Sequence, residues 1–229
     1  MSDLRRLITR LDDIEARIRN LEADECIKKL ADALDVTDLD DEDGLIWFED
    51  DELFKGRVIM LDGQIFLPAS AGWPSTTNGC ADPTQVEFGT NDIDIYLADF
   101  DPDSDEYMQF GFVMPSDYDG GTITAQFYWT ADSGSSDDVV WGLQAVALGD
   151  GISLDQAWGA EKQVVDTHEG TANYMDQTDL TDAITIAGTP APSKYVQIRV
   201  RRDADSGSDT LSADARLIGI MISFDRAWV

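Results

Sequence analysis

Two stretches, YMQFGFVM at residues 107–114 and TITAQFYW at residues 122–129, decide the fold of this chain. Large apolar side chains occupy every second position in both: Met108, Phe110, Phe112 and Met114 in the first, and Ile123, Ala125, Phe127 and Trp129 in the second. Because successive side chains of a β-strand point to opposite faces, a period of two indicates a strand with one buried face. Each stretch is therefore predicted to be a strand that covers a hydrophobic core.

The same period recurs toward the C-terminus. It is found within residues 139–148 (Trp141, Leu143, Ala145), within 196–201 (Val196, Ile198, Val200) and within 218–224 (Ile218, Ile220, Ile222, Phe224). Asp, Gly and Ser residues separate the strands, and most of the connections lack a helical period. The pattern predicts a mainly β fold, with an antiparallel β-sandwich over residues 91–229. A jelly-roll-like topology is expected, because this many strands must protect their edges.

Residues 44–90 are predicted to form a small β-hairpin region followed by a loop. Short strands are expected at residues 45–48, 57–60 and 65–67. The dipeptide Asp62-Gly63 lies between the last two, and it favours the positive φ angles of a tight hairpin turn. Residues 70–84 contain Pro and Gly without any periodicity, so we expect a long loop there.

The first 24 residues carry a heptad repeat whose seam is entirely apolar: Leu4, Leu7, Leu11, Ile14, Ile18 and Leu21. Arg10 and Arg17 flank this seam on one side, and Glu15 and Glu22 flank it on the other. Each arginine can therefore pair with a glutamate of the next heptad on a parallel neighbour. The two Arg–Glu segments resemble the trimerisation motif of short three-stranded coiled coils. We expect a parallel trimeric coiled-coil stem at residues 1–24; the alternative is one amphipathic helix packed on its own domain.

The segment between stem and sandwich, residues 25–43, changes character along its length. Residues 26–36 keep an apolar face that a helix would have, but the heptad pattern lapses. Residues 37–43 are mostly acidic, which predicts an exposed hinge.

The chain is strongly acidic, with 46 Asp and Glu against 16 Lys and Arg and a formal net charge of −30. Such a surface excludes nucleic acid as an expected partner. Because the acids are spread over the whole chain, we interpret them as an adaptation to concentrated salt and expect a halophilic source. We also expect a soluble chain without membrane insertion or a Sec signal, since it has neither a run of 18 apolar residues nor an apolar N-terminal region with a cleavage site.

The sequence contains no recognisable catalytic motif. His168 is the single histidine, and no nucleophile motif accompanies it, so we expect a structural histidine and no enzyme. Cys26 and Cys80 are far apart and are expected to be lone thiols without a cofactor. Two clusters of alternating acids are weak candidates for a structural Ca²⁺ or another cation, although neither matches an EF-hand: Asp101, Asp103 and Asp105 in the first, and Asp203, Asp205 and Asp209 in the second.

Three aromatic residues lie outside the predicted core faces. Tyr107 and Tyr128 occupy the polar phase of their strands, and Trp73 lies in the predicted loop. These three are the candidates for contact with a ligand, because the remaining strand aromatics are explained by core packing.

The segment from Tyr107 to Phe224 resembles β-sandwich domains of virion proteins from tailed viruses, notably in FVMPSDYDGG at residues 112–121. A parallel stem ahead of a β body is also the plan of many viral fibres, spikes and capsid decoration proteins. The resemblance implies a homotrimeric structural protein in a virion. Its expected partners are other virion proteins and a glycan or protein of the host surface.

Two alternative functions stay open at this point. Solvent-facing aromatics on a sandwich suit a carbohydrate-binding module of a secreted or cell-surface protein. The abundant carboxylates also allow a polysaccharide hydrolase, although no pair of them stands out.

Overall fold

The computed structural model describes residues 62–227. The predicted stem (1–24), the acidic hinge (25–43) and the predicted strands at 45–48 and 57–60 lie outside the described residues. Within residues 62–227, no helix is long and apolar enough to cross a membrane.

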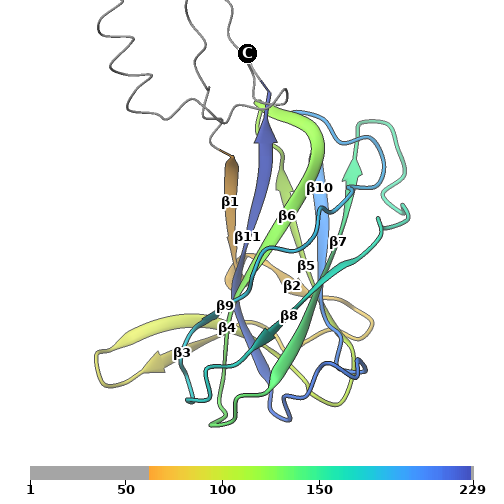
Figure 1. The fold of residues 1–229 in the computed structure, drawn as a ribbon. Helices are drawn as coiled ribbons and strands as arrows, with labels where there is room; N and C mark the ends of the chain where they lie inside the picture. The colour runs from red at the N-terminus through yellow and green to blue at the C-terminus, as the bar shows by residue number, and fades with distance from the viewer. Residues whose placement is uncertain (1–61, 228–229) are drawn as a thin grey trace, which may run out of the picture. The chain divides into compact units, whose positions relative to one another are not determined.

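The described residues form two antiparallel sheets that face each other (Figure 1). Sheet 1 contains β1 (Gly63–Pro68), β3 (Thr84–Phe88), β4 (Ile93–Phe100), β6 (Tyr118–Ala131), β9 (Asp176–Gln177) and β11 (Ala215–Arg226). Sheet 2 contains β2 (Trp73–Pro74), β5 (Glu106–Val113), β7 (Asp138–Leu148), β8 (Lys162–Thr167) and β10 (Tyr195–Arg202). A short 3₁₀ turn, η2 (Ala69–Ala71), joins β1 to β2. The predicted mainly β, antiparallel sandwich is confirmed.

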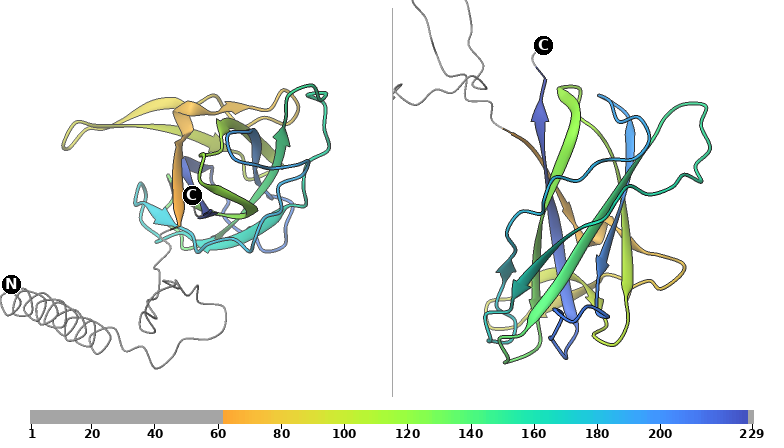
Figure 2. Two further views of the ribbon diagram at one scale, coloured as in Figure 1. Left: turned by 90° about the horizontal axis from the view of Figure 1, so that it is seen from above. Right: turned by 45° about the vertical axis from the view of Figure 1, so that its right-hand side comes forward.

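The strand order places the chain repeatedly in both sheets. Sheet 1 runs β3-β4-β11-β6-β9, with β1 also on β11, and sheet 2 runs β2-β5-β10-β7-β8. Within the described residues the chain crosses between the sheets at every connection except those from β3 to β4 and from β7 to β8. The hairpin of β3 and β4 extends beyond the other strands in Figure 1 and in the left view of Figure 2.

Residues 63–88, which the sequence assigns to a separate hairpin region, supply strands to both sheets. The strand expected at residues 65–67 is present as part of β1, and its partner is β11, which lies about 150 residues later in the chain. β2 pairs with β5, and β3 pairs with β4. The expected loop at residues 70–84 therefore contains β2, the short edge strand of sheet 2.

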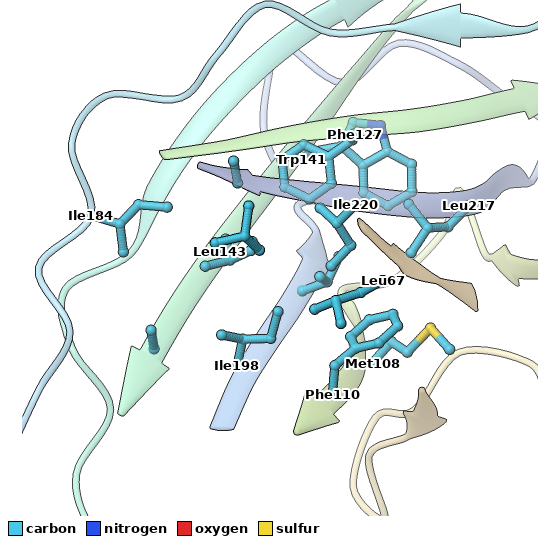
Figure 3. Packing of buried hydrophobic residues seen from close by; sticks show 14 of the residues in the cluster. Leu67, Met108, Phe110, Phe127, Trp141, Leu143, Ile184, Ile198, Leu217 and Ile220 are labelled. Carbon is cyan, nitrogen blue, oxygen red and sulfur yellow. The ribbon is translucent and has the colours of Figure 1, made fainter. Parts of the chain in front are cut away.

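The core lies between the sheets and is built from the predicted apolar phases (Figure 3). Trp141 of β7 stacks on Phe127 of β6, with ring centroids 5.5 Å apart and an interplanar angle of 13°. Phe100 meets the same indole edge-on at 5.1 Å. Cross-sheet aromatic contacts of this kind hold the two sheets in register, because each ring is buried by residues of the opposite sheet.

One predicted core position is wrong. Ile218 was expected to share the core face with Ile220, Ile222 and Phe224, but it is only partly buried, whereas Leu217 is fully buried. The cause is a register shift between Leu217 and Gly219 in the pairing of β11 with β6. A bulge adds one residue to a strand and so reverses the phase of its faces from that point on.

The fully buried Arg202 joins the end of β10 to the loop that follows it and to the end of β4; we call this region the lower end of the sandwich. Its Nε and Nη2 donate to the two carboxylate oxygens of Asp209, at 3.1 and 2.8 Å. Its Nη1 donates to the carbonyl oxygens of Phe100 and Ala213, and Nη2 also donates to the carbonyl oxygen of Leu211. All five N–H groups of the guanidinium are thereby satisfied, which is the condition for burying such a charge.

Candidate functional site

The outer face of sheet 2 carries polar and aromatic side chains that hydrogen-bond and stack on one another. We call it the polar face of sheet 2 and define it by nine residues: Trp73, Tyr107, Gln109, Gln144, Trp158, Tyr195, Gln197, Arg199 and Arg201. The alternation of β5, β7 and β10 produces it, because the residues between these positions point into the core. The sheet itself is visible in Figure 2.

The pairing registers place these side chains in rows across the strands. Arg199 of β10 lies directly between Gln109 of β5 and Gln144 of β7. Trp73 of β2 lies opposite Gln109 on the other side, so it continues the same row to the sheet edge. Directly opposed residues share a face and have Cβ atoms about 5 Å apart, so this row is a continuous surface. The Trp73 side chain is 46% exposed, which leaves much of its ring free for a partner.

A chain of hydrogen bonds fixes the amides of this face. The Tyr195 hydroxyl donates to Oε1 of Gln197 at 2.7 Å, and Nε2 of Gln197 donates to Oε1 of Gln109 at 3.1 Å. Nε2 of Gln109 then donates to the hydroxyl of Ser75 at 3.0 Å. Each amide still has one N–H and one carbonyl lone pair to offer. The face therefore presents donors and acceptors whose directions are set before any ligand arrives.

Arg199 is held between two aromatic rings. Its guanidinium carbon lies 4.6 Å from the ring centre of Tyr107 and 5.0 Å from that of Trp158. Its Nε donates to Oε1 of Gln144 at 3.2 Å, and Nη2 donates to the same oxygen. Gln144 is held in turn, because its Nε2 donates to the carbonyl oxygen of Gly159, next to Trp158. The loop before β8 is thus fastened over β7, and the guanidinium is fixed in one plane.

Arg201, two residues along β10, has a different environment. It pairs with Asp105, Glu161 and Asp203, and hydrogen bonds from Gln163 reach two of these acids. Burial lowers the pKa of Arg201, but its hydrogen bonds with Glu161 and Asp105 outweigh burial and raise the pKa above its usual range. Burial also raises the pKa of the Asp203 carboxyl, although Gln163 and Arg201 oppose the shift.

The acidic residues that the sequence proposed for a cation are thus placed around arginines. Asp105 and Asp203 come together at Arg201, and Asp209 is bound to Arg202. Asp205 uses its backbone N–H to reach the Asp105 carboxylate at 3.3 Å. In residues 62–227, no group of three or more His, Cys, Asp or Glu side chains has a metal-binding arrangement. The cation sites, including those with Asp101 and Asp103, stay predictions.

Two glycines leave room for this arrangement. A Cβ at Gly111 would lie 1.8 Å from the Tyr195 hydroxyl, so only glycine lets that side chain lie across β5. A Cβ at Gly142 would lie 2.8 Å from the Glu161 carboxyl carbon. Both contacts are far shorter than van der Waals distance, so a larger residue would displace the side chains that form the face.

The structure brings two of the three predicted ligand aromatics together. Trp73 and Tyr107 both lie on the polar face of sheet 2. Tyr128 lies on the outer face of sheet 1, where its ring meets Phe66 edge-on with centroids 5.6 Å apart. Within residues 62–227 no arginine stacks on this pair. Two amides do flank Tyr128, because its hydroxyl donates to Oε1 of Gln126 at 3.4 Å and accepts from Nε2 of Gln177 at 3.2 Å.

His168 and Cys80 have structural surroundings, as predicted. The His168 ring is fully buried, with Nδ1 2.6 Å from the Asp176 carboxylate and Nε2 3.1 Å from the Ser133 carbonyl oxygen. Cys80 is a free, buried thiol, and burial raises its pKa to about 12. A protonated, buried thiol is a poor nucleophile.

Sequence reasoning missed most of the polar face of sheet 2. It identified the alternation of β10 correctly, and that alternation already placed Gln197, Arg199 and Arg201 on one face. It gave no sign of which strands would flank β10, and these neighbours supply Gln109 and Gln144. Trp158 follows no periodicity, so nothing in the sequence pointed to it.

Comparisons with known proteins find similarity only at the level of solved structures. No family model matches the chain, and no curated protein sequence matches it. The xylan-binding module CBM15 is 13% identical over 73% of this chain and 99% of that module, with a TM-score of 0.40. A cycloisomaltooligosaccharide glucanotransferase from Paenibacillus sp. is 12% identical over 65% of this chain, with a TM-score of 0.34. The match spans only 17% of the length of that glucanotransferase.

A structure of infectious bursal disease virus is also similar, at 9% identity over 79% of this chain and 37% of the viral chain, with a TM-score of 0.31. Similarities this weak identify neither a site nor a ligand. The function is therefore derived from the residues of the chain itself.

Proposed function

We propose that the sandwich is a non-catalytic carbohydrate-binding module and that its ligand, a polysaccharide chain, lies on the polar face of sheet 2. The observation that carries the proposal is the combination on one face of exposed or half-exposed aromatic rings with side-chain amides of fixed direction. The apolar faces of sugar rings pack on aromatic side chains, and their hydroxyls need both donors and acceptors. Trp73 and Tyr107 supply aromatic rings. Gln109 and Gln197 supply donors and acceptors, and Gln144 keeps one free N–H, because its Oε1 accepts two hydrogen bonds from Arg199.

The dimensions of the face also suit an extended ligand. Tyr107 and Tyr195 pair with Arg201 and Val113 respectively, six residues apart along β5. At about 3.3 Å per residue this separation is about 20 Å. A face of this length accommodates several successive sugar units, whereas a small metabolite would use only part of it.

The experiment is a binding comparison between the two outer faces of the sandwich. The full chain is screened by affinity electrophoresis in gels that contain neutral and acidic polysaccharides, and the best ligand is then titrated by calorimetry. Trp73→Ala is expected to weaken binding about tenfold or more, because an exposed aromatic anchor carries a large share of the binding free energy. Tyr107→Ala should act in the same direction.

Phe66→Ala is the matched control, because Phe66 is also an exposed aromatic (44%) but lies on sheet 1. It should leave affinity unchanged. Failure of every polysaccharide to bind, or an equal loss in Trp73→Ala and Phe66→Ala, would contradict the proposal.

The heptad repeat at residues 1–24 favours a second candidate, a homotrimeric virion appendage that attaches to a host surface. Three binding faces on one stem would act together, because the first contact raises the effective concentration of the others to about millimolar. Light scattering in concentrated salt should give three times the chain mass of 25.2 kDa. A single-chain mass would exclude the trimer, and a gene neighbourhood without capsid or tail genes would argue against the virion.

A further inference from the structure

Arg199 differs from the other arginines of the described residues in having no acidic partner. Arg201, Arg202, Arg216 and Arg226 each pair with at least one aspartate or glutamate. Arg199 contacts the neutral Gln144 and two aromatic rings instead. In a chain with 46 acidic residues, a half-exposed arginine without a carboxylate is the exception. Its positive charge is not neutralised within residues 62–227.

Three acids around the neighbouring Arg201 are already engaged. Asp105, Glu161 and Asp203 are all bound to Arg201, with N···O distances of 2.7, 2.5 and 2.9 Å. Nε2 of Gln163 also donates hydrogen bonds to the carboxylates of Glu161 and Asp203, at 2.9 and 2.7 Å. These bonds direct the carboxylates toward Arg201, so Arg199 is left free to meet a charge from outside.

The geometry of Arg199 is that of a prepared anion site. Nε and Nη2 use one edge of the guanidinium for Gln144, which leaves both N–H groups of Nη1 and one of Nη2. That remaining edge is the fork that binds a carboxylate or sulfate through two parallel hydrogen bonds. The rings of Tyr107 and Trp158 hold the plane of the fork, so little conformational entropy is lost on binding.

We infer that Arg199 forms an anion subsite of the polar face of sheet 2 and that the bound polysaccharide is acidic, with a carboxylate or sulfate on a sugar unit received by the Arg199 fork. This inference rests on the proposed function, because it names the class of ligand for the same face. It also explains why Arg201 has three acidic partners and Arg199 has none: the two arginines have different roles, one structural and one in binding.

The net charge of −30 repels an acidic polymer, and the salt concentration decides whether this repulsion outweighs the direct contact with Arg199. Repulsion from distant acids is screened within about 10 Å at 0.1 M salt and within about 3 Å at 1 M, whereas a direct bidentate contact is screened least. The test is therefore made in about 0.5 M NaCl, with the full chain.

The experiment uses pairs of ligands that share a sugar backbone, one with and one without the charged group. Oligogalacturonate is compared with its methyl ester, and a sulfated galactan with the same galactan after desulfation. The parent chain is expected to bind at least one of the charged forms about 10- to 100-fold more tightly than its uncharged counterpart, as charge-assisted hydrogen bonds require. The pair that shows the difference identifies the anion as carboxylate or sulfate.

Variants then assign the preference to Arg199. Arg199→Gln should lower affinity for the charged ligand by about 10- to 100-fold and affinity for the uncharged one by far less. Arg199→Lys keeps the charge but loses the fork, so its affinity for the charged ligand should lie between those of the parent chain and Arg199→Gln. Arg226→Gln removes an equal charge from sheet 1 and should change neither the affinity for the charged ligand nor that for the uncharged one.

The outcomes separate this inference from the proposed function. If charged and uncharged ligands bind the parent chain equally, and Trp73→Ala still weakens binding about tenfold or more, the anion subsite is wrong and the carbohydrate-binding face stands. If no polysaccharide of either kind binds, the proposed function is wrong, and the inference fails with it. The comparison of ligands on the parent chain needs no variant, so it decides whether the bound polysaccharide is acidic even if Arg199→Gln unfolds; Arg199→Lys then assigns the preference to Arg199.

Discussion

Asp209→Ala is expected to lower the free energy of unfolding by about 3–5 kcal/mol, because it leaves the buried guanidinium of Arg202 without its counter-charge. Both residues are almost fully buried, with side-chain exposures of 2% and 0%. The Asp209 carboxylate also accepts the backbone N–H of Val140 at 3.1 Å, so the substitution removes three hydrogen bonds at once. Denaturant unfolding of the full chain, followed by tryptophan fluorescence, measures the change.

The same turn supplies the control. Asp205 is exposed, and Asp205→Ala should change stability by less than about 0.5 kcal/mol, as expected for a surface position. If Asp209→Ala were as stable as Asp205→Ala, the buried pair would not hold the lower end of the sandwich together.

Trp141→Ala is expected to cost a similar amount, about 3–5 kcal/mol, for a different reason. It opens a cavity among Phe100, Phe127 and Trp129, whose rings lie 5.1, 5.5 and 6.2 Å from the Trp141 ring. Thermal unfolding followed by circular dichroism should show a correspondingly large fall in Tm.

Trp141→Phe separates packing from hydrogen bonding. The buried indole N–H of Trp141 has no hydrogen-bond partner in the described residues, whereas that of Trp129 donates to Asp166 at 2.7 Å. Replacing Trp141 by Phe should therefore cost clearly less than replacing Trp129 by Phe, which also strands a carboxylate whose pKa is raised by burial. Equal losses in the two variants would show that ring volume alone matters here.

The strands of the sandwich could be predicted because each one carries its own signal. The alternation in β5, β6, β7 and β10 is local, and burial follows the phase in β5 and β10. In β7 residues of both phases are buried, Val140 and Val146 included. The position of Ile218 could not be predicted, because the bulge after Leu217 lies in a run of apolar residues where either phase looks buried. The pairing of the strands could not be predicted either, because partners such as β1 and β11 are separated by most of the sequence.

The polar face of sheet 2 was only partly predictable for the same reason. Tyr107 was identified from the polar phase of its strand and Trp73 from its predicted loop, and the structure places both on the same face. The sequence shows that Arg199 points away from the core, but not that Gln144 comes from β7 or that Trp158 folds back over it. A binding face on a sheet is made by strand order, and strand order is set by long-range contacts.

The most direct test of the carbohydrate-binding face is to observe the indole N–H signals of the chain by NMR while a bound polysaccharide fragment is titrated in. Trp73 and Trp158 lie on the polar face of sheet 2, whereas Trp129 and Trp141 are fully buried in the core. The signals of Trp73 and Trp158 should shift or broaden as the ligand binds, and those of Trp129 and Trp141 should not move. Unchanged Trp73 and Trp158 signals, with shifts confined to the amides of Phe66 and Tyr128 on sheet 1, would contradict the account.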